Sequence, residues 1–148
     1  MGLLNKVYED TFYLQGEGEK NVFLSHSSVD KDLALYIASD LKKAKINVWF
    51  DKWDLKLGHS IPKEIGKGLD AADALLIIVS KDYLESAFCR DEWEAFYMKY
   101  NSLNRPIIPI IIDESEPPTI LCARKYYKLT DMQYYDDMMN ELKCVLAE

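Results

Sequence analysis

The chain has 148 residues, of which 49% are hydrophobic and 29% are charged, and its formal net charge is −7. This length predicts a single core, and the composition excludes disordered and fibrous proteins. Because no stretch gathers Lys and Arg densely, nucleic acid and anionic membrane surfaces are not expected as partners. The three cysteines and two histidines show neither CxxC pairing nor metal-ligand spacing. We therefore expect reduced thiols, no metal site and a cytoplasmic location.

The first twenty residues mix Leu, Tyr and acidic residues without a firm period and end in the stretch GEGEK. We expect a lead-in segment over residues 1–20 with a flexible joint, followed by one domain over residues 21–148. No basic region followed by an apolar core opens the chain, so no secretory signal is predicted. The longest apolar run, residues 107–112, contains a proline and is too short to cross a bilayer.

Hydrophobic runs and periodic apolar positions alternate along the domain. Strands are predicted at residues 22–24, 46–50, 74–79, 106–112 and 125–129. Helices are predicted after residue 30, at residues 61–69, from residue 84 onward and near the C-terminus, because apolar side chains recur there at helical spacing. The run at 74–79 has no polar alternation, as expected for a strand covered on both faces. Pro109 is expected where the sheet needs no backbone donor.

This order of elements predicts an α/β fold, with right-handed crossovers and a parallel sheet that has helices on both faces. In such sheets ligands bind outside the carboxyl ends of the strands. The segments expected to leave those ends are residues 25–28, 51–60, 80–92 and 113–119. We therefore expect the functional side chains in these segments.

Several enzyme classes lack their signatures in these segments. The residues after the first predicted strand contain neither GxGxxG nor GxxxxGK[ST], which disfavours Rossmann dehydrogenases and P-loop NTPases. A Ser/His/Asp hydrolase built from Ser25, His26 and Asp51 is disfavoured because adjacent Ser and His side chains rarely face each other and no GxSxG elbow exists. A phospho-accepting receiver domain needs a pair of acidic residues after its first strand, whereas this chain has the polar, uncharged residues 25–28 there.

Four groups of residues occur in order along the chain. They read VFLSHSS at 22–28, VWFD at 48–51, GHSI at 58–61 and LIIVS at 76–80, followed by Tyr83, Ser86, Phe88, Cys89 and Glu92. Together they resemble the successive boxes of a TIR (Toll/interleukin-1 receptor) domain, from about residue 21 to the end of the chain. The residues in these groups are most similar to those of bacterial and enzyme-type members. The resemblance implies a flavodoxin-like, three-layer fold with a five-stranded parallel sheet in the order 2-1-3-4-5.

For catalytic members the resemblance also implies cleavage of NAD+, as substrate and not as cofactor, between nicotinamide and ribose. The family pattern W-C-x-x-E reads F-C-R-D-E at residues 88–92, so the carried-over catalytic residue is Glu92. A lone carboxylate fits this chemistry, because nicotinamide is a cationic leaving group and the transition state gathers positive charge on the ribose. Phe88 could stack on a ring of the substrate. Ser25 and His26, with Asp51 and Trp53, would form the opposite wall.

Two departures and one competing hypothesis accompany this interpretation. Phe88 replaces the usual Trp, which leaves linear ADP-ribose and a cyclic ADP-ribose isomer both open as products. Many relatives have Gly before the second strand, where this chain has Lys45 and Asn47. The competing hypothesis is a non-catalytic module that acts by TIR–TIR self-association through the loop at residues 51–60. By analogy, a bacterial member would act in antiphage defence or signalling.

Overall fold

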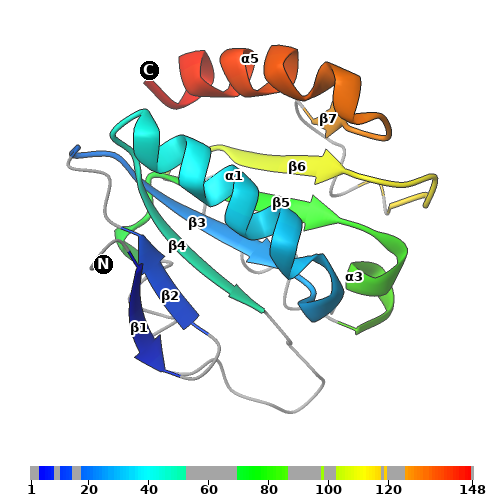
Figure 1. Cartoon of the computed structure of the whole chain (residues 1–148), viewed down its shortest axis with the longest axis horizontal. Helices are drawn as coiled ribbons and strands as arrows, with labels where there is room; N and C mark the ends of the chain where they lie inside the picture. Colours follow the sequence, from blue (N-terminus) through cyan, green and yellow to red (C-terminus); the bar gives the residue numbers. More distant parts are fainter. Residues whose placement is uncertain are drawn as a thin grey trace.

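The computed structural model describes residues 4–8, 11–14, 18–52, 70–86, 98, 103–117, 119 and 126–147. Within this part of the chain one sheet holds seven strands in the order β1-β2-β4-β3-β5-β6-β7 (Figure 1). The strands are β1 (Leu4–Tyr8), β2 (Thr11–Leu14), β3 (Asn21–His26), β4 (Asn47–Lys52), β5 (Ala74–Val79), β6 (Ile107–Ile111) and β7 (Tyr127–Lys128). The described helices are α1 (Lys31–Lys43), α3 (Lys81–Ser86) and α5 (Tyr135–Ala147), with the 3-10 turns η1 (Ser28–Asp30) and η3 (Met132–Tyr134).

Strands β4, β3, β5, β6 and β7 are parallel neighbours. Numbered along the chain, these five strands have the order 2-1-3-4-5, so the predicted flavodoxin-like sheet is confirmed. Two strands run further at their carboxyl ends than predicted. Strand β3 continues through His26 and β4 through Lys52, whereas the sequence predicted loops there. The reason is mutual pairing, because Ser25 is the register partner of Asp51 and His26 that of Lys52.

Strands β1 and β2 form an antiparallel hairpin inside the segment for which no strand was predicted. Strand β2 then pairs antiparallel with β4, from Thr11 opposite Asp51 to Leu14 opposite Val48. The sequence TFYL of β2 is rich in residues that favour strands, but their partners lie about forty residues further along the chain. The hairpin therefore extends the sheet beyond the five parallel strands. The division of the chain at residue 20 stays a prediction.

The residues predicted to be a flexible joint are tied to the turn between α1 and β4. The side-chain amide of Asn47 donates to the Gly18 carbonyl at 2.8 Å and to Asn21 Oδ1 at 3.2 Å. Gly18 also lies so close to the carbonyl oxygen of Lys45 that a Cβ atom at this position would clash with it. The described end of the joint is thus held by contacts that only a tertiary structure reveals.

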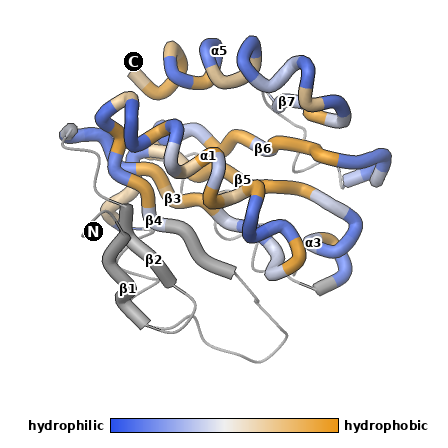
Figure 2. Tube along the Cα trace, in the orientation of Figure 1, coloured by the Kyte–Doolittle hydropathy of each residue, from blue (hydrophilic) through white to orange (hydrophobic). Residues whose placement is uncertain are grey.

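One face of the sheet forms a continuous apolar core with α1 and α5 (Figures 1 and 2). Helix α1 buries Ala34, Ile37, Ala38 and Leu41, and α5 buries Tyr135, Met138, Met139, Leu142 and Leu146. The strand residues of this core alternate along β3, β5 and β6 and include Leu24, Leu76 and Ile110. The predicted helix after residue 30 and the predicted C-terminal helix are both confirmed.

The opposite face of the central strands is buried as well. Phe23, Leu75, Ile77 and Val79 point away from the α1 and α5 core in the strand alternation, and each is 0% exposed. Strand β5 is therefore covered on both faces, as its unbroken apolar run predicted. The helix predicted at residues 61–69 lies outside the described residues. A helix was also predicted from residue 84 onward. The described helix α3 begins earlier, at Lys81, and overlaps this prediction at residues 84–86.

Pro109 lies in β6 opposite Ile77 of β5. Leu75 N donates to the Pro106 carbonyl and Ile112 N to the Val79 carbonyl, so the polar groups of even-numbered β6 residues face β5. The missing donor of Pro109 therefore faces the β7 side. The described pairing with β7 begins at Ile110, so Pro109 lies before the first described pair of this ladder.

Lys45 ends the turn between α1 and β4 in a left-handed backbone conformation with a φ of 67°. Its N–H donates to the Lys42 carbonyl at 2.9 Å, as at many helix ends. Glycine favours this position because a side chain strains a left-handed residue. Of the two residues that stand where many relatives have Gly, Lys45 and not Asn47 takes the left-handed conformation.

Replacing Lys45 with Gly should stabilise the fold by about 1 kcal/mol, since the strain of the left-handed side chain is removed. Urea denaturation of wild type and variant measures this difference. Lys42→Gly is the matched control, because Lys42 lies within α1 and Gly should cost about 1 kcal/mol there. Equal destabilisation by both changes would contradict the argument.

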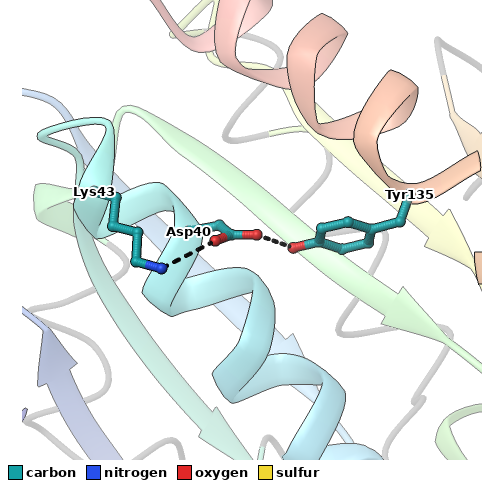
Figure 3. Close-up of polar contacts among 3 residues, drawn as sticks. All are labelled: Asp40, Lys43 and Tyr135. Carbon is teal, nitrogen blue, oxygen red and sulfur yellow. Dashed lines mark hydrogen bonds and ion pairs between the residues drawn. The ribbon is translucent and has the colours of Figure 1, made fainter.

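A hydrogen bond joins α1 to the first residue of α5 (Figure 3). The Tyr135 hydroxyl donates to Asp40 Oδ2 at 2.7 Å, and Lys43 Nζ lies 3.9 Å from Asp40 Oδ1. The ring of Tyr36 meets that of Tyr135 edge-on, with centroids 5.0 Å apart. Burial, followed by the hydrogen bond to Asp40, raises the pKa of Tyr135 far above its ordinary value of 10.0.

Tyr135→Phe should lower the free energy of unfolding by about 1–2 kcal/mol at pH 7, because a hydrogen bond to a carboxylate is lost. A group whose pKa is raised in the folded state stabilises the fold fully at pH values below its unfolded-state pKa. That stabilisation is lost as the pH rises above the unfolded-state pKa. The difference between wild type and Tyr135→Phe should therefore shrink above about pH 10.

Urea denaturation at pH 7, 9 and 10.5 tests this dependence. Tyr126→Phe is the control, because Tyr126 is 45% exposed and the change should have little effect at any pH. A Tyr135→Phe difference that stays constant with pH would show that the Tyr135 hydroxyl does not carry the effect.

Candidate functional site

The carboxyl ends of β3, β4, β5 and β6 meet at the edge of the sheet beside α3 (Figure 1). Ser25 and His26 are the last two residues of β3 and are 0% and 2% exposed. Asp51, the register partner of Ser25, belongs to β4. The structure thus places the backbones of these three predicted site residues side by side. A contact of any of them with a substrate stays a prediction.

His26 and Ser25 direct their polar atoms to different partners. His26 Nδ1 lies 2.7 Å from the Ser27 carbonyl oxygen, and because a carbonyl only accepts, Nδ1 carries the proton of this bond. The Ser25 hydroxyl lies 3.0 Å from the Tyr83 hydroxyl. Within the described residues this is the hydrogen bond that the Ser25 side chain makes, so Ser25 and His26 do not form a nucleophile–base pair.

Asp30 connects the segment after β3 to the segment after β5. Its Oδ2 accepts hydrogen bonds from the Ser27 hydroxyl at 2.7 Å and from the Ser80 hydroxyl at 2.6 Å. Ser80 is 5% exposed and Ser27 is 1% exposed, so both hydroxyls need a protein partner. The carboxylate of Asp30 therefore satisfies two buried hydroxyl groups at once.

Ser80 caps α3, and its hydroxyl oxygen accepts from Tyr83 N at 3.1 Å. This is the side-chain bond typical of a serine that precedes the first helical turn. The Ser80 carbonyl accepts from Leu84 N at 3.0 Å. Ser80 is thus donor to Asp30 and acceptor from α3.

Asp113, just after β6, holds the first residue of α3 from another side. Its Oδ2 accepts from Lys81 N at 2.8 Å, and its Oδ1 accepts from Ser115 N at 3.0 Å. Partial burial opposes ionisation, but the hydrogen bonds from Ser115 and Lys81, together with the charge of Lys81, hold the pKa of Asp113 below its ordinary value. A carboxylate from the β6 end therefore binds the amino terminus of α3.

Glu92, Phe88 and Trp53 lie outside the described residues, and their roles stay predictions. Glu92 follows the last residue of α3 by six positions. The described residues also line a cavity of about 400 Å³ at the opposite edge of the sheet. Its walls include Asn21, Ala74 and Pro106, at the amino ends of β3, β5 and β6. This cavity is therefore remote from the edge where parallel sheets bind their ligands.

Sequence reasoning missed the bond between Asp30 and Ser80 and the bond from Lys81 N to Asp113. The local signal for Ser80 was present, since a serine after an apolar strand often begins a helix. Asp30 and Ser80 are fifty positions apart, and nothing in their neighbourhoods indicates the pairing. The contact follows from β3 and β5 being adjacent strands.

Among the described residues, no helix has the length and the hydrophobicity needed to cross a membrane.

The model of the TIR domain family matches residues 22–143. These residues include every element from the end of the hairpin to most of α5.

Curated relatives carry names that describe reactions. The chain is 30% identical over 96 residues to the probable 2′ cyclic ADP-D-ribose synthase TcpO of Methanobrevibacter olleyae, covering 64% of this chain and 28% of that protein. It is 28% identical over 91 residues to the NAD(+) hydrolase PdTIR of Paracoccus denitrificans (strain Pd 1222), covering 61% and 30%. The chain thus spans about a third of the length of these relatives.

A solved structure supports the fold. The TIR domain of the Toll-related receptor TRR-2 from Hydra magnipapillata superposes with a TM-score of 0.66 at 17% identity, covering 86% of this chain and 98% of that domain. At this identity the likeness concerns the fold alone.

Proposed function

The chain belongs to the TIR domain family, and we propose that it cleaves NAD+ at the bond between nicotinamide and ribose, with Glu92 as the catalytic residue. The observation that carries the proposal is the family match over residues 22–143, which contains F-C-R-D-E at residues 88–92. The names of the relatives, an NAD(+) hydrolase and a cyclic ADP-ribose synthase, support the same substrate.

The proposed chemistry needs few catalytic groups. Nicotinamide is a cation in NAD+ and leaves as a neutral molecule, so no general acid is required. Positive charge then develops on the ribose, as in glycoside hydrolysis, and the Glu92 carboxylate stabilises it. Phe88 stacks on a ring of the substrate, and Asp51 and Trp53 form the facing wall. Ser25 and His26 are buried beside Asp51, where they support that wall.

The product is either linear ADP-ribose or a cyclic ADP-ribose isomer. Phe88 keeps a stacking face but lacks the indole donor of the usual Trp, so the choice between attack by water and attack by a nucleophilic group of the ADP-ribose itself rests with the pocket around Phe88. We place the activity in the cytoplasm, where depletion of NAD+ or a cyclic product would serve antiphage defence or signalling. The resemblance to enzyme-type TIR domains supports this role.

Glu92→Ala should abolish nicotinamide release from NAD+ by lowering kcat at least about a hundredfold, because the charge on the ribose loses its counterion. Chromatography of the reaction mixture measures nicotinamide, and mass spectrometry of the same samples separates ADP-ribose from its cyclic isomer.

Glu85→Gln is the matched control, because Glu85 is an exposed carboxylate on α3 and its loss should leave the rate unchanged. Circular dichroism verifies that each variant is folded. The assay is run on concentrated protein, so that any required assembly is present. A silent wild type, or a Glu92→Ala variant with the wild-type rate, would rule out the enzymatic function.

The second candidate function is signalling by self-association, and exposed apolar side chains favour it. Tyr36 on α1 is 56% exposed, and Tyr134 in η3 is 57% exposed. Tyr36 contacts Tyr135, the residue that follows Tyr134 in the sequence, so the two exposed rings are candidates for one contact surface. Exposed aromatic patches are typical of protein interfaces. The loop at residues 51–60 is the other candidate contact.

Light scattering at several protein concentrations tests self-association. Trp53→Ala should shift the protein to monomer if the loop makes the contact, and Tyr36→Ser should do so if the aromatic surface makes it. NAD+ turnover of the same samples separates the two functions. A wild type that remains monomeric at all concentrations would exclude the scaffold.

A further inference from the structure

Helix α3 is fixed at its beginning by contacts to the segments that follow β3 and β6. The Ser80 hydroxyl accepts from Tyr83 N and donates to Asp30 Oδ2, so the helix cap is itself bound to the segment after β3. Lys81 N donates to Asp113 after β6. Side chains from both neighbouring strand ends therefore set the position of the first turn of α3.

Tyr83 fixes α3 a second time, through its side chain. The residue is 0% exposed, and its hydroxyl meets the hydroxyl of Ser25, also 0% exposed, at 3.0 Å. A buried hydroxyl without a partner is costly, so this pair fixes both the depth of the ring and the direction of the helix that carries it. The backbone of Tyr83 is held by Ser80 and its side chain by β3.

The chain passes from this anchored helix toward the proposed catalytic residue. Tyr83 is nine positions before Glu92, and the last residue of α3, Ser86, is six positions before it. Catalytic geometry is sensitive to displacements of about 1 Å, because a carboxylate stabilises the transition state only when it is placed correctly. Because Glu92 follows α3 after so few residues, we expect a shift of α3 to change the placement of its carboxylate.

We propose that Ser80 and Tyr83 are positioning residues for NAD+ cleavage, which hold α3 through Asp30 and Ser25 and thereby place Glu92. The proposal rests on the proposed function. Ser80 and Tyr83 contact no substrate in this arrangement, so their loss lowers kcat and leaves substrate binding nearly intact. The hydroxyl group is the essential feature at both positions.

Ser80→Ala and Tyr83→Phe should each lower kcat about tenfold while KM changes less than about twofold. Ser80→Thr keeps a hydroxyl at the cap and should retain most of the rate. Tyr135→Phe is the matched control, because it also removes a tyrosine hydroxyl bonded to a side chain, but this bond joins α5 to Asp40 of α1. Its kcat should equal that of the wild type. Circular dichroism and thermal unfolding verify that all variants are folded.

Amide hydrogen exchange tests the anchoring without relying on activity. In Ser80→Ala and Tyr83→Phe the amide of Leu84 should exchange at least about tenfold faster than in the wild type, while amides of β5 keep their protection. In Tyr135→Phe the amide of Leu84 should be unaffected.

The outcomes of the two proposals are distinguishable. If Glu92→Ala is inactive but Ser80→Ala and Tyr83→Phe keep the wild-type kcat, the cleavage stands and the positioning role is overturned. If the wild type releases no nicotinamide, the proposed function fails, and with it the role of these residues in cleavage. Unchanged exchange at Leu84 in both variants overturns the anchoring itself, whatever the activity.

Discussion

Burial of the central strands on both faces is the constraint on which the rest of the structure depends. Strand β5 is buried over its whole length, and β3 and β6 lie on either side of it. Polar side chains of these strands are therefore found at the strand ends, where the chain leaves the sheet. The concentration of Ser25, His26, Ser80 and Asp113 at one edge follows from this packing.

At that edge, the buried hydroxyl groups of Ser25, Ser27, Ser80 and Tyr83 are bonded to protein atoms. Asp30 accepts from two serines, and Ser25 pairs with Tyr83. These bonds connect segments after β3 and β5 that are far apart in sequence. The resulting contacts hold the loop ends without a metal or a disulfide among the described residues. A rigid edge of this kind suits a site whose chemistry depends on the placement of one carboxylate.

The parts of the fold that repeat a period were predictable, and the parts that depend on distant pairing were not. Residues 74–79 form a strand with the predicted bounds. Six consecutive apolar residues are typical of a strand that is buried on both faces. The hairpin of β1 and β2 was missed, since its partner β4 begins at Asn47. The family resemblance predicted Glu92 and Phe88 as site residues, and these roles stay predictions, whereas the bond between Asp30 and Ser80 required the strand order.

Helix α1 takes part in both halves of the polar framework. Its preceding residue, Asp30, binds the cap of α3, and its Asp40 binds Tyr135 of α5. These two acids are separated by about 15 Å of helix, and each satisfies a hydroxyl from a different part of the chain. Asp30, at the connection between β3 and α1, thus fixes the start of α3 through its bond to Ser80. The sequence around α3, taken alone, gives no sign of this anchoring, because the bond joins side chains that are fifty positions apart.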